Sequence, residues 1–398
     1  MLFRSHIYTT PHIVLTIPHF EAAHKCALNA HLTNLIYNCR LMLKDCDKDF
    51  GMVVAAKTMK AAVYTGPGQV VVEERPMPGE PGPGELLVKI KTCGLCGSDV
   101  TEWYMAPRVP VVLGHEPAGD VIAVGEGVTE FKVGDRVALH HHMPCMVCDI
   151  CMHGNYGSCP QFKQTRLHPA GMAEYVRVPR EIVDGDVLKL SDDLPYEAGS
   201  LVEPIACVVR ALDRSNIRIG DRVLVMGAGF NGVVAAMLAP HWGADKVAVL
   251  DRVPVRLERV QKLGINTFNV DAPDLKAQIT DWTQGAGPHI VIVTPSKIPA
   301  IQQGFDLCGI GATLMLYGPP SPEDRWPLDA NAMFFKEIDI RASYSAGPHD
   351  TRRTLSMLRN RVIDYKALIT HRFPLQEADK AWHLTKAAGD SLKVMVEI

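Results

Sequence analysis

A glycine-rich turn between an apolar strand and an apolar helix constrains the fold of this chain more than any other feature. Residues 222–226 predict a strand and residues 233–238 a helix, and they are joined by Gly227-Ala228-Gly229-Phe230-Asn231-Gly232. The first glycine permits a tight turn, the second lets a pyrophosphate approach the backbone, and the third allows close contact of helix and strand. Free N–H groups at the helix start then face the phosphates. This spacing predicts a dinucleotide-binding βαβ unit.

An acidic residue ends the next predicted strand, at the distance that such a unit requires. Asp251 can accept hydrogen bonds from an adenosine ribose and would repel a 2′-phosphate, which favours NAD. Two alternatives stay open: Asp251 only caps the helix that starts near Pro254, or the neighbouring arginines accommodate NADP, the less favoured cofactor. The residues that we predict to contact the cofactor are Gly227, Gly229, Phe230, Asn231, Gly232, Asp251, Arg252 and Arg256.

The rest of the 398 residues divides into two patterns, as expected for a chain roughly two to three times the usual domain length. Between Met59 and about Ile205, short apolar runs separated by glycine and proline predict a compact antiparallel β domain. From about residue 206, strands alternate with helices, which predicts a parallel, doubly wound sheet and an α/β fold class. After about Ser345, a helix–strand–helix–strand tail either extends that sheet or returns to the first domain. The strands expected in the second part are 223–226, 246–250, 290–293 and 312–317, and the helices are 255–263, 274–282 and 298–307.

Composition excludes two classes of partner. The 41 basic and 44 acidic side chains give a net charge of −3, so we expect no nucleic acid partner. The longest stretch without charge or histidine, Val223–Pro240, contains the glycine turn, so we interpret it as a buried strand and helix and expect no membrane span. Eleven cysteines, four of them clustered, indicate metal binding rather than a disulfide framework and favour a reducing cytoplasm.

Residues 1–58 differ from the remainder. They lack the charged, apolar and cleavage-site order of a secretory signal, and their acidic residues argue against an amphipathic transit peptide. The pattern changes abruptly at Met59, which is followed by a predicted strand. We interpret residues 1–58 as an accessory extension or an upstream start artefact.

Four clustered cysteines predict a metal-bound lobe. Cys145, Cys148, Cys151 and Cys159 follow a C-x2-C-x2-C-x7-C pattern. Four thiolates with no open position suit a structural Zn²⁺, which would hold together a loop that lacks a core of its own. An iron–sulfur cluster, which also uses four cysteines, is the alternative.

Three further motifs together supply a mixed ligand set. Cys93-Gly94-Leu95-Cys96, Gly114-His115-Glu116 and Glu203-Pro204 provide thiolate, imidazole and carboxylate, the donors of an open zinc site. Spacing alone also allows Cys93 and Cys96 to pair as a dithiol. Adjacent side chains on an extended strand diverge, so we interpret His140-His141-His142 as loop residues rather than ligands.

From Met59 to the C-terminus, the order of these motifs resembles the zinc-dependent medium-chain dehydrogenases, close to sorbitol and threonine dehydrogenases. The motifs that carry the resemblance are Cys96-Gly97-Ser98-Asp99, Gly114-His115-Glu116, the four cysteines, Gly171-Met172-Ala173-Glu174-Tyr175, Glu203-Pro204 and the glycine turn. The resemblance implies a GroES-like catalytic domain at 59–205 and 346–398, a Rossmann cofactor domain at 206–345, and a homodimer or homotetramer.

The resemblance also implies site residues. Cys96, His115 and Glu116 correspond to the catalytic zinc ligands, Glu203 to a fourth, exchangeable ligand, and Ser98 to the hydroxyl that passes the substrate proton onward. Two positions depart from the family. Thr101 stands where members usually carry a histidine proton relay, and Glu102 places an anion near the expected substrate entrance.

The expected reaction is oxidation of a secondary alcohol. Zinc would lower the pKa of the hydroxyl, Ser98 would accept its proton, and hydride would pass to C4 of NAD. A polyol or sugar-derived alcohol is the first choice of substrate, because Glu102 and Thr101 make the mouth polar. A threonine-like amino alcohol is the second choice, since Glu102 would attract an ammonium group. The alternative from another class is a zinc- and NAD-binding sensor without turnover.

Overall fold

The computed structural model describes residues 58–398. The extension predicted at residues 1–58 therefore lies outside the described residues, except for Thr58, at which strand β1 begins. Among the described residues, the structure contains no helix that is long and apolar enough to cross a membrane.

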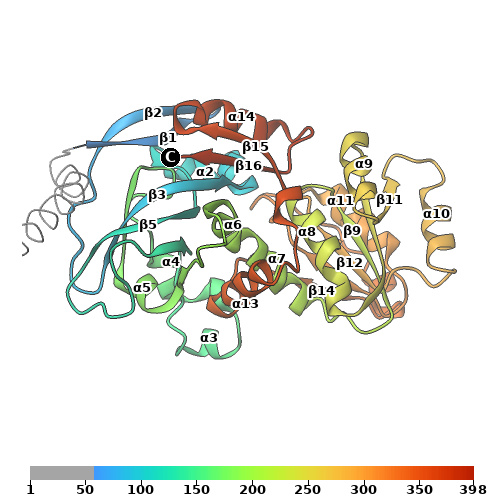
Figure 1. Ribbon diagram of the computed structural model, residues 1–398. Coiled ribbons are helices and arrows are strands. Elements are labelled where there is room, and N and C mark those ends of the chain that lie inside the picture. Colours follow the sequence, from blue (N-terminus) through green and yellow to red (C-terminus); the bar gives the residue numbers. More distant parts are fainter. Residues whose placement is uncertain (1–57) are drawn as a thin grey trace, which may run out of the picture. The chain divides into compact units, whose positions relative to one another are not determined.

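A six-stranded parallel sheet forms the second half of the fold, in the order β11-β10-β9-β12-β13-β14 (Figure 1). The chain runs outward from β9 through β10 to β11 and then crosses to β12 on the other side of β9. Ligands bind at such a switch point in doubly wound sheets, outside the carboxyl ends of the strands. The strands are β9 (Asp221–Met226), β10 (Ala244–Asp251), β11 (Asn266–Asn269), β12 (Ile290–Val293), β13 (Thr313–Leu316) and β14 (Asp339–Ala342).

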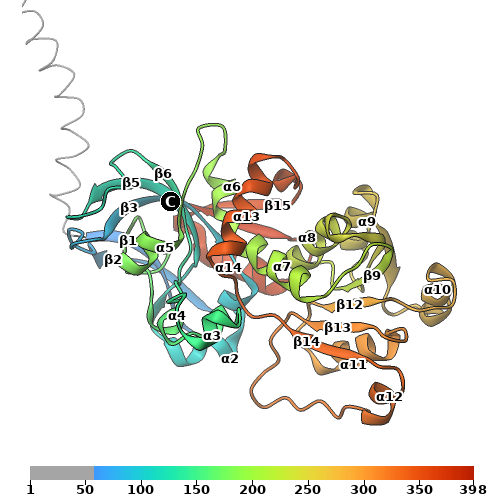
Figure 2. The same ribbon diagram turned by 90° about the horizontal axis from the view of Figure 1, so that it is seen from below.

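Helices cover both faces of this sheet (Figure 2), which explains why its central strands are apolar throughout. Val223 and Val225 of β9 belong to the core shared with helix α8, whereas Leu224 and Met226 belong to the core shared with α10 and α11. The predicted α/β fold class is therefore confirmed. The helices of this part are α8 (Phe230–Leu238), α9 (Pro254–Lys262), α10 (Leu275–Trp282), α11 (Ile298–Leu307) and α12 (Ala330–Phe335).

The first part of the chain forms a mostly antiparallel sheet in the order β15-β16-β3-β5-β6-β8, with β7 also paired to β3. A small sheet in the order β2-β1-β4 accompanies it. The strands are β1 (Thr58–Gly66), β2 (Gln69–Pro76), β3 (Leu86–Leu95), β4 (Val111–Val112), β5 (Glu116–Val124), β6 (Arg136–Leu139), β7 (Tyr175–Val178), β8 (Val187–Lys189), β15 (Ile369–Pro374) and β16 (Lys393–Glu397). The helices are α2 (Glu102–Met105), α3 (Asp149–Met152), α4 (Pro160–Gln164), α5 (Arg180–Asp186) and α6 (Tyr196–Ser200).

The C-terminal tail returns to this first sheet. β16 pairs antiparallel with β3, so that Val394 lies opposite Leu95 and Val396 opposite Cys93. Helix α14 (Ala378–Ala387) packs beside the same strands, as the red and blue segments of Figure 1 show. The sequence pattern left open whether the tail extends the parallel sheet or returns to the first domain, and in the structure it returns to the first domain.

Helix α7 (Val202–Arg214) joins the two parts. It packs against α8 of the parallel sheet and against α13 (Pro348–Arg359), and its apolar side chains belong to the core that contains β9. The boundary predicted near residue 206 falls inside this helix. One rigid element therefore carries Glu203 of the predicted site while it contacts the half of the fold that contains the parallel sheet.

Candidate active site

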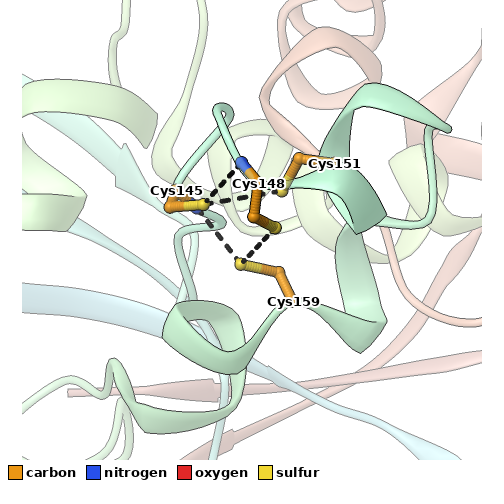
Figure 3. A group of neighbouring side chains, drawn as sticks. All are labelled: Cys145, Cys148, Cys151 and Cys159. Atoms are coloured by element: carbon orange, nitrogen blue, oxygen red, sulfur yellow. Dashed lines mark hydrogen bonds between the residues drawn. The ribbon is translucent and has the colours of Figure 1, made fainter.

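The four-cysteine lobe has the geometry of a site for one metal ion (Figure 3). Its four sulfur atoms lie within 4.8 Å of one another, and the Cys145–Cys151 and Cys148–Cys159 sulfur pairs are 4.0 and 3.9 Å apart. Zinc–sulfur bonds of about 2.3 Å give a tetrahedron with edges of about 3.8 Å. An iron–sulfur cluster places several atoms between its cysteines and needs a wider spacing. The geometry favours a single ion.

Backbone N–H groups favour the thiolate form of a cysteine in this lobe. Burial opposes ionisation of Cys159, but the N–H groups of Cys145 and Phe162 lower the pKa of its thiol to about 6. Burial raises the pKa of Cys151 to about 12. A cation that binds Cys151 must therefore replace a proton on a thiol that burial keeps protonated.

Arg210 of α7 connects the lobe to the rest of the protein. Its guanidinium donates to the Gly154 carbonyl, lies over the Tyr156 ring at 5.1 Å and faces Asp350 of α13 at 3.9 Å. Arg210 is only 8% exposed. The lobe is therefore anchored to the same helix that carries Glu203 two turns earlier.

Cys96, His115 and Glu116 form a second group, with ligand atoms all within 4.8 Å of one another. Strand pairing brings them together, because Gly94 near the end of β3 lies opposite Glu116 at the start of β5. Gly114 permits the close approach: its φ is +88°, and a Cβ there would lie 2.7 Å from the Cys93 sulfur. Three of the four predicted catalytic ligands are thus neighbours.

Asp99 orients His115, a role that the sequence did not assign. Its Oδ1 lies 3.2 Å from His115 Nδ1, and its Oδ2 accepts a hydrogen bond from the Cys96 N–H at 3.0 Å. Burial would raise the pKa of Asp99, but the charge and hydrogen bond of His115 outweigh it and lower that pKa. A carboxylate on Nδ1 leaves Nε2 for a metal, the usual arrangement of a metal-ligating histidine.

Lys393 of β16 pairs with Glu116, which sequence patterns did not reveal. Its Nζ lies 2.7 and 2.8 Å from the two carboxylate oxygens, donates to the Leu95 carbonyl, and sits 4.3 Å from the centre of the Phe230 ring. Burial would lower the pKa of Lys393, but Glu116 raises it. The C-terminal strand thereby supplies the counter-charge of a predicted metal ligand.

Glu203 lies in a third group, with His140 and His141, rather than within the group of Cys96 and His115. The expectation that the adjacent imidazoles diverge is wrong for His140 and His141, whose ligand atoms also lie within 4.8 Å of each other. They are indeed loop residues, but they follow the end of β6, where the alternation of an extended strand no longer applies. Burial, followed by the neighbouring imidazoles, lowers the pKa of His141 well below that of a free imidazole.

The glycine turn has the predicted geometry. Gly227 has a φ of +95°, and a Cβ on Gly232 would lie 1.8 Å from the Gly227 carbonyl oxygen. Gly229 is the N-cap of α8, and a Cβ there would meet only Arg256 Nη1, at 3.7 Å. Asp251 accepts hydrogen bonds from the N–H groups of Ala228 (2.6 Å) and Val253 (2.8 Å), so it braces the turn. The turn is open where a pyrophosphate would approach.

The family follows from this geometry together with similarity to known proteins. Residues 82–192 match the alcohol dehydrogenase GroES-like domain, and residues 232–360 match the zinc-binding dehydrogenase family. Sorbitol dehydrogenase of Halalkalibacterium halodurans is 33% identical over 349 residues, which cover 85% of this chain and 99% of that enzyme. The chain belongs to the zinc-dependent medium-chain alcohol and polyol dehydrogenases. This dehydrogenase acts on CH–OH donors and uses zinc and a nicotinamide cofactor.

Solved structures similar to this dehydrogenase contain both nicotinamide cofactors. An alcohol dehydrogenase of Escherichia coli CFT073 in complex with NADH has a TM-score of 0.77 and 26% identity, covering 86% of this chain and all of that one. A protein of Sinorhizobium meliloti 1021 bound to NADP has a TM-score of 0.76 and 26% identity, with the same coverage. The choice between NAD and NADP therefore depends on this chain's own residues.

The two arginines of the predicted cofactor site have protein partners in this dehydrogenase. Arg256 donates to the carbonyls of Gly389 (2.6 Å) and Ser391 (3.1 Å), and the exposed Arg252 lies 3.7 Å from Asp271. Asn231 lies in the first turn of α8 beside Phe230. Both arginines nevertheless lie near the end of β10, because Arg252 follows Asp251 directly and Arg256 Nη1 lies 3.7 Å from the Cβ position of Gly229.

The two residues that depart from the family pattern, Thr101 and Glu102, also interact with other residues of the protein. Thr101 Oγ1 donates to the Gly97 carbonyl at 2.7 Å, so its hydroxyl proton is already engaged. Glu102 forms an ion pair with Lys386 of α14, which neutralises the anion expected near the substrate entrance. This pair weakens the argument for an amino-alcohol substrate, since Glu102 is not a free anion. Ser98 is half-buried two residues after Cys96 in the 3-10 helix Gly97–Val100.

Proposed function

We propose that this dehydrogenase oxidises a secondary alcohol of a polyol or sugar-derived substrate and that NAD accepts the hydride. The observation that carries the proposal is the group of Cys96, His115 and Glu116, whose donor atoms lie within 4.8 Å of one another. Sorbitol dehydrogenases from several organisms, including Bacillus subtilis at 30% identity over 351 residues, support the polyol class.

The donor set fits a zinc ion. Cys96, His115 and Glu116 would hold it, with Glu203 as the exchangeable fourth ligand, and the His115 ring is already fixed by Asp99. Zinc bound there would supply a Lewis acid that lowers the pKa of an alcohol. Lys393 balances the Glu116 charge, and the Glu203 carboxylate lies on the rigid helix α7.

The protein's own residues then accept the proton and position the cofactor. The hydroxyl oxygen of Ser98 would be the first proton acceptor, and Thr101 can pass a proton onward only if its bond to the Gly97 carbonyl breaks. The N–H groups at the start of α8 would bind the pyrophosphate, and Asp251 would accept hydrogen bonds from the ribose through its remaining lone pairs. The Asp251 charge favours NAD over NADP.

Two zinc ions per subunit are part of the proposal, one catalytic and one in the four-cysteine lobe. The support for the second is the agreement of the sulfur–sulfur distances with a tetrahedral site. The eight cysteines of the described residues are all free, which is in keeping with a reducing compartment such as the cytoplasm. A homodimer or homotetramer is the expected assembly.

A substrate screen tests the function. Absorbance of NADH is followed with a panel of polyols, sugar alcohols and L-threonine, before and after removal of zinc by a chelator. We expect turnover with at least one polyol, loss of that turnover on chelation, and recovery when zinc is added back. Turnover with L-threonine alone would assign the amino-alcohol class. No turnover by zinc-loaded, NAD-binding protein would leave the sensor function instead.

A further inference from the structure

A buried histidine outside the predicted ligand set has the bonding pattern of a metal ligand. His140 is 2% exposed, and its Nδ1 lies 2.6 Å from Asp186 Oδ2. Its Nε2 is buried and has no hydrogen-bond partner. Leaving a buried polar atom without a partner is unfavourable, so such an atom calls for a ligand.

The Asp186 carboxylate is fully buried and held from two sides. Its Oδ1 accepts a hydrogen bond from Thr351 Oγ1 at 2.5 Å and lies 3.8 Å from Arg352 Nη1. Asp186 therefore acts as an acceptor toward His140 Nδ1, which leaves Nε2 as the ring nitrogen available to a cation. The Asp99–His115 pair of the predicted catalytic site has the same arrangement.

His141 provides a second unpartnered nitrogen next to the first. Its Nδ1 is buried without a hydrogen-bond partner. The centre of its ring is 5.2 Å from the His140 ring and 4.9 Å from the His115 ring. His141 therefore lies between the predicted zinc ligand His115 and the Asp186-bound His140.

Glu203 completes the group with a carboxylate. It is 7% exposed, and its Oε1 accepts a hydrogen bond from the Cys207 thiol at 3.4 Å. One ligand atom each from His140, His141 and Glu203 can lie within 4.8 Å of the others. Two imidazoles and one carboxylate form a ligand set that binds zinc in enzymes.

We propose that His140, His141 and Glu203 form a second cation-binding position, suited to zinc, beside the group of Cys96, His115 and Glu116. A carboxylate has two oxygens, so Glu203 can contribute to both positions. Asp99 and Asp186 add negative charge next to the ligands His115 and His140, which offsets part of the repulsion between two cations. Sites with two metal ions about 3.5–4 Å apart use such shared carboxylates.

Metal content tests this cation-binding position independently of turnover. If the position proves absent, the proposed function is therefore unaffected. Full-length protein is loaded with zinc, freed of loose metal by gel filtration, and measured by elemental mass spectrometry. We expect about three zinc ions per chain, one more than the catalytic and four-cysteine sites account for. About two zinc ions per chain would overturn the proposal, because the unpartnered nitrogens would then face only water or substrate.

Variants locate the additional ion. His141→Asn removes a nitrogen that has no protein partner to lose, and His140→Gln removes the Asp186-bound ligand; each should bind one zinc equivalent less than the parent. The control is His142→Asn, because His142 Nδ1 bonds the Thr165 carbonyl and an Asn amide can still donate there. That control should keep the full zinc content. Circular dichroism shows whether His141→Asn and His140→Gln are folded. If both folded variants also keep the full zinc content, the proposed cation-binding position does not exist.

Discussion

The buried pair of Lys393 and Glu116 allows the sharpest test of the site. Lys393→Met keeps most of the side-chain volume but leaves the Glu116 carboxylate, which is 1% exposed, without its cation. Removing one partner of a buried pair costs about 3–5 kcal/mol. With an unfolding entropy of about 2.1 cal/mol/K per residue over about 340 residues, that cost lowers the Tm by about 4–7 °C.

The assay is thermal unfolding of zinc-depleted protein, because zinc on Glu116 would replace part of the missing positive charge. Lys386→Met is the matched control, since Lys386 pairs with Glu102 at the surface, where the two side chains are 39% and 53% exposed. An exposed pair contributes about 1 kcal/mol or less. We expect the decrease in Tm caused by Lys393→Met to become smaller when zinc is added. It should also become smaller when Lys393→Met is combined with Glu116→Gln. Equal Tm shifts for Lys393→Met and Lys386→Met would refute the reasoning.

Four other changes separate the roles assigned above. Cys96→Ser should abolish turnover while the circular dichroism spectrum stays that of the parent; retained activity would exclude Cys96 as a ligand. Cys151→Ser should release one zinc ion and lower the Tm, because the lobe has little core of its own; an unchanged zinc content and Tm would remove the structural-zinc assignment. Asp251→Asn keeps an acceptor for the turn but loses the charge, so the ratio of kcat/KM for NAD to that for NADP should fall, and a constant ratio would contradict the role of Asp251. Deletion of residues 1–58 should leave kcat/KM unchanged, and an inactive truncated protein would show that they are required.

The elements that could be predicted most closely from sequence are those with a clear apolar pattern. Ile290–Val293 and Ile298–Leu307 have the predicted bounds, because continuous apolar runs and helical spacing mark them clearly. The edge strands β11 and β14 were not predicted. Asn266–Asn269 and Asp339–Ala342 carry polar residues at the margins of the sheet, so they lack the apolar pattern of a central strand.

The site was predictable only where ligands lie in short motifs. Cys96, His115 and Glu116 could be identified, but the partner of Glu116 lies 277 residues later, and no local pattern indicates such a pairing. Asp99 could have been found, since it lies in the same motif as Cys96. The position of His140 and His141 depended on where β6 ends, and element ends are the least reliable part of a sequence prediction.

The pairing of β16 with β3 has a consequence for biosynthesis. About 300 residues separate Leu95 from Lys393, so a ribosome adding 5–20 residues per second takes roughly 15–60 s to deliver the last strand. During that interval β7 can pair with Leu86–Lys89 of β3, but the Thr92–Leu95 end of the same edge has no strand beside it and Glu116 has no lysine. A nonsense mutation that removes only the final six codons would therefore yield a nascent chain whose nucleotide-binding half can form but whose catalytic half stays open to chaperones and proteases.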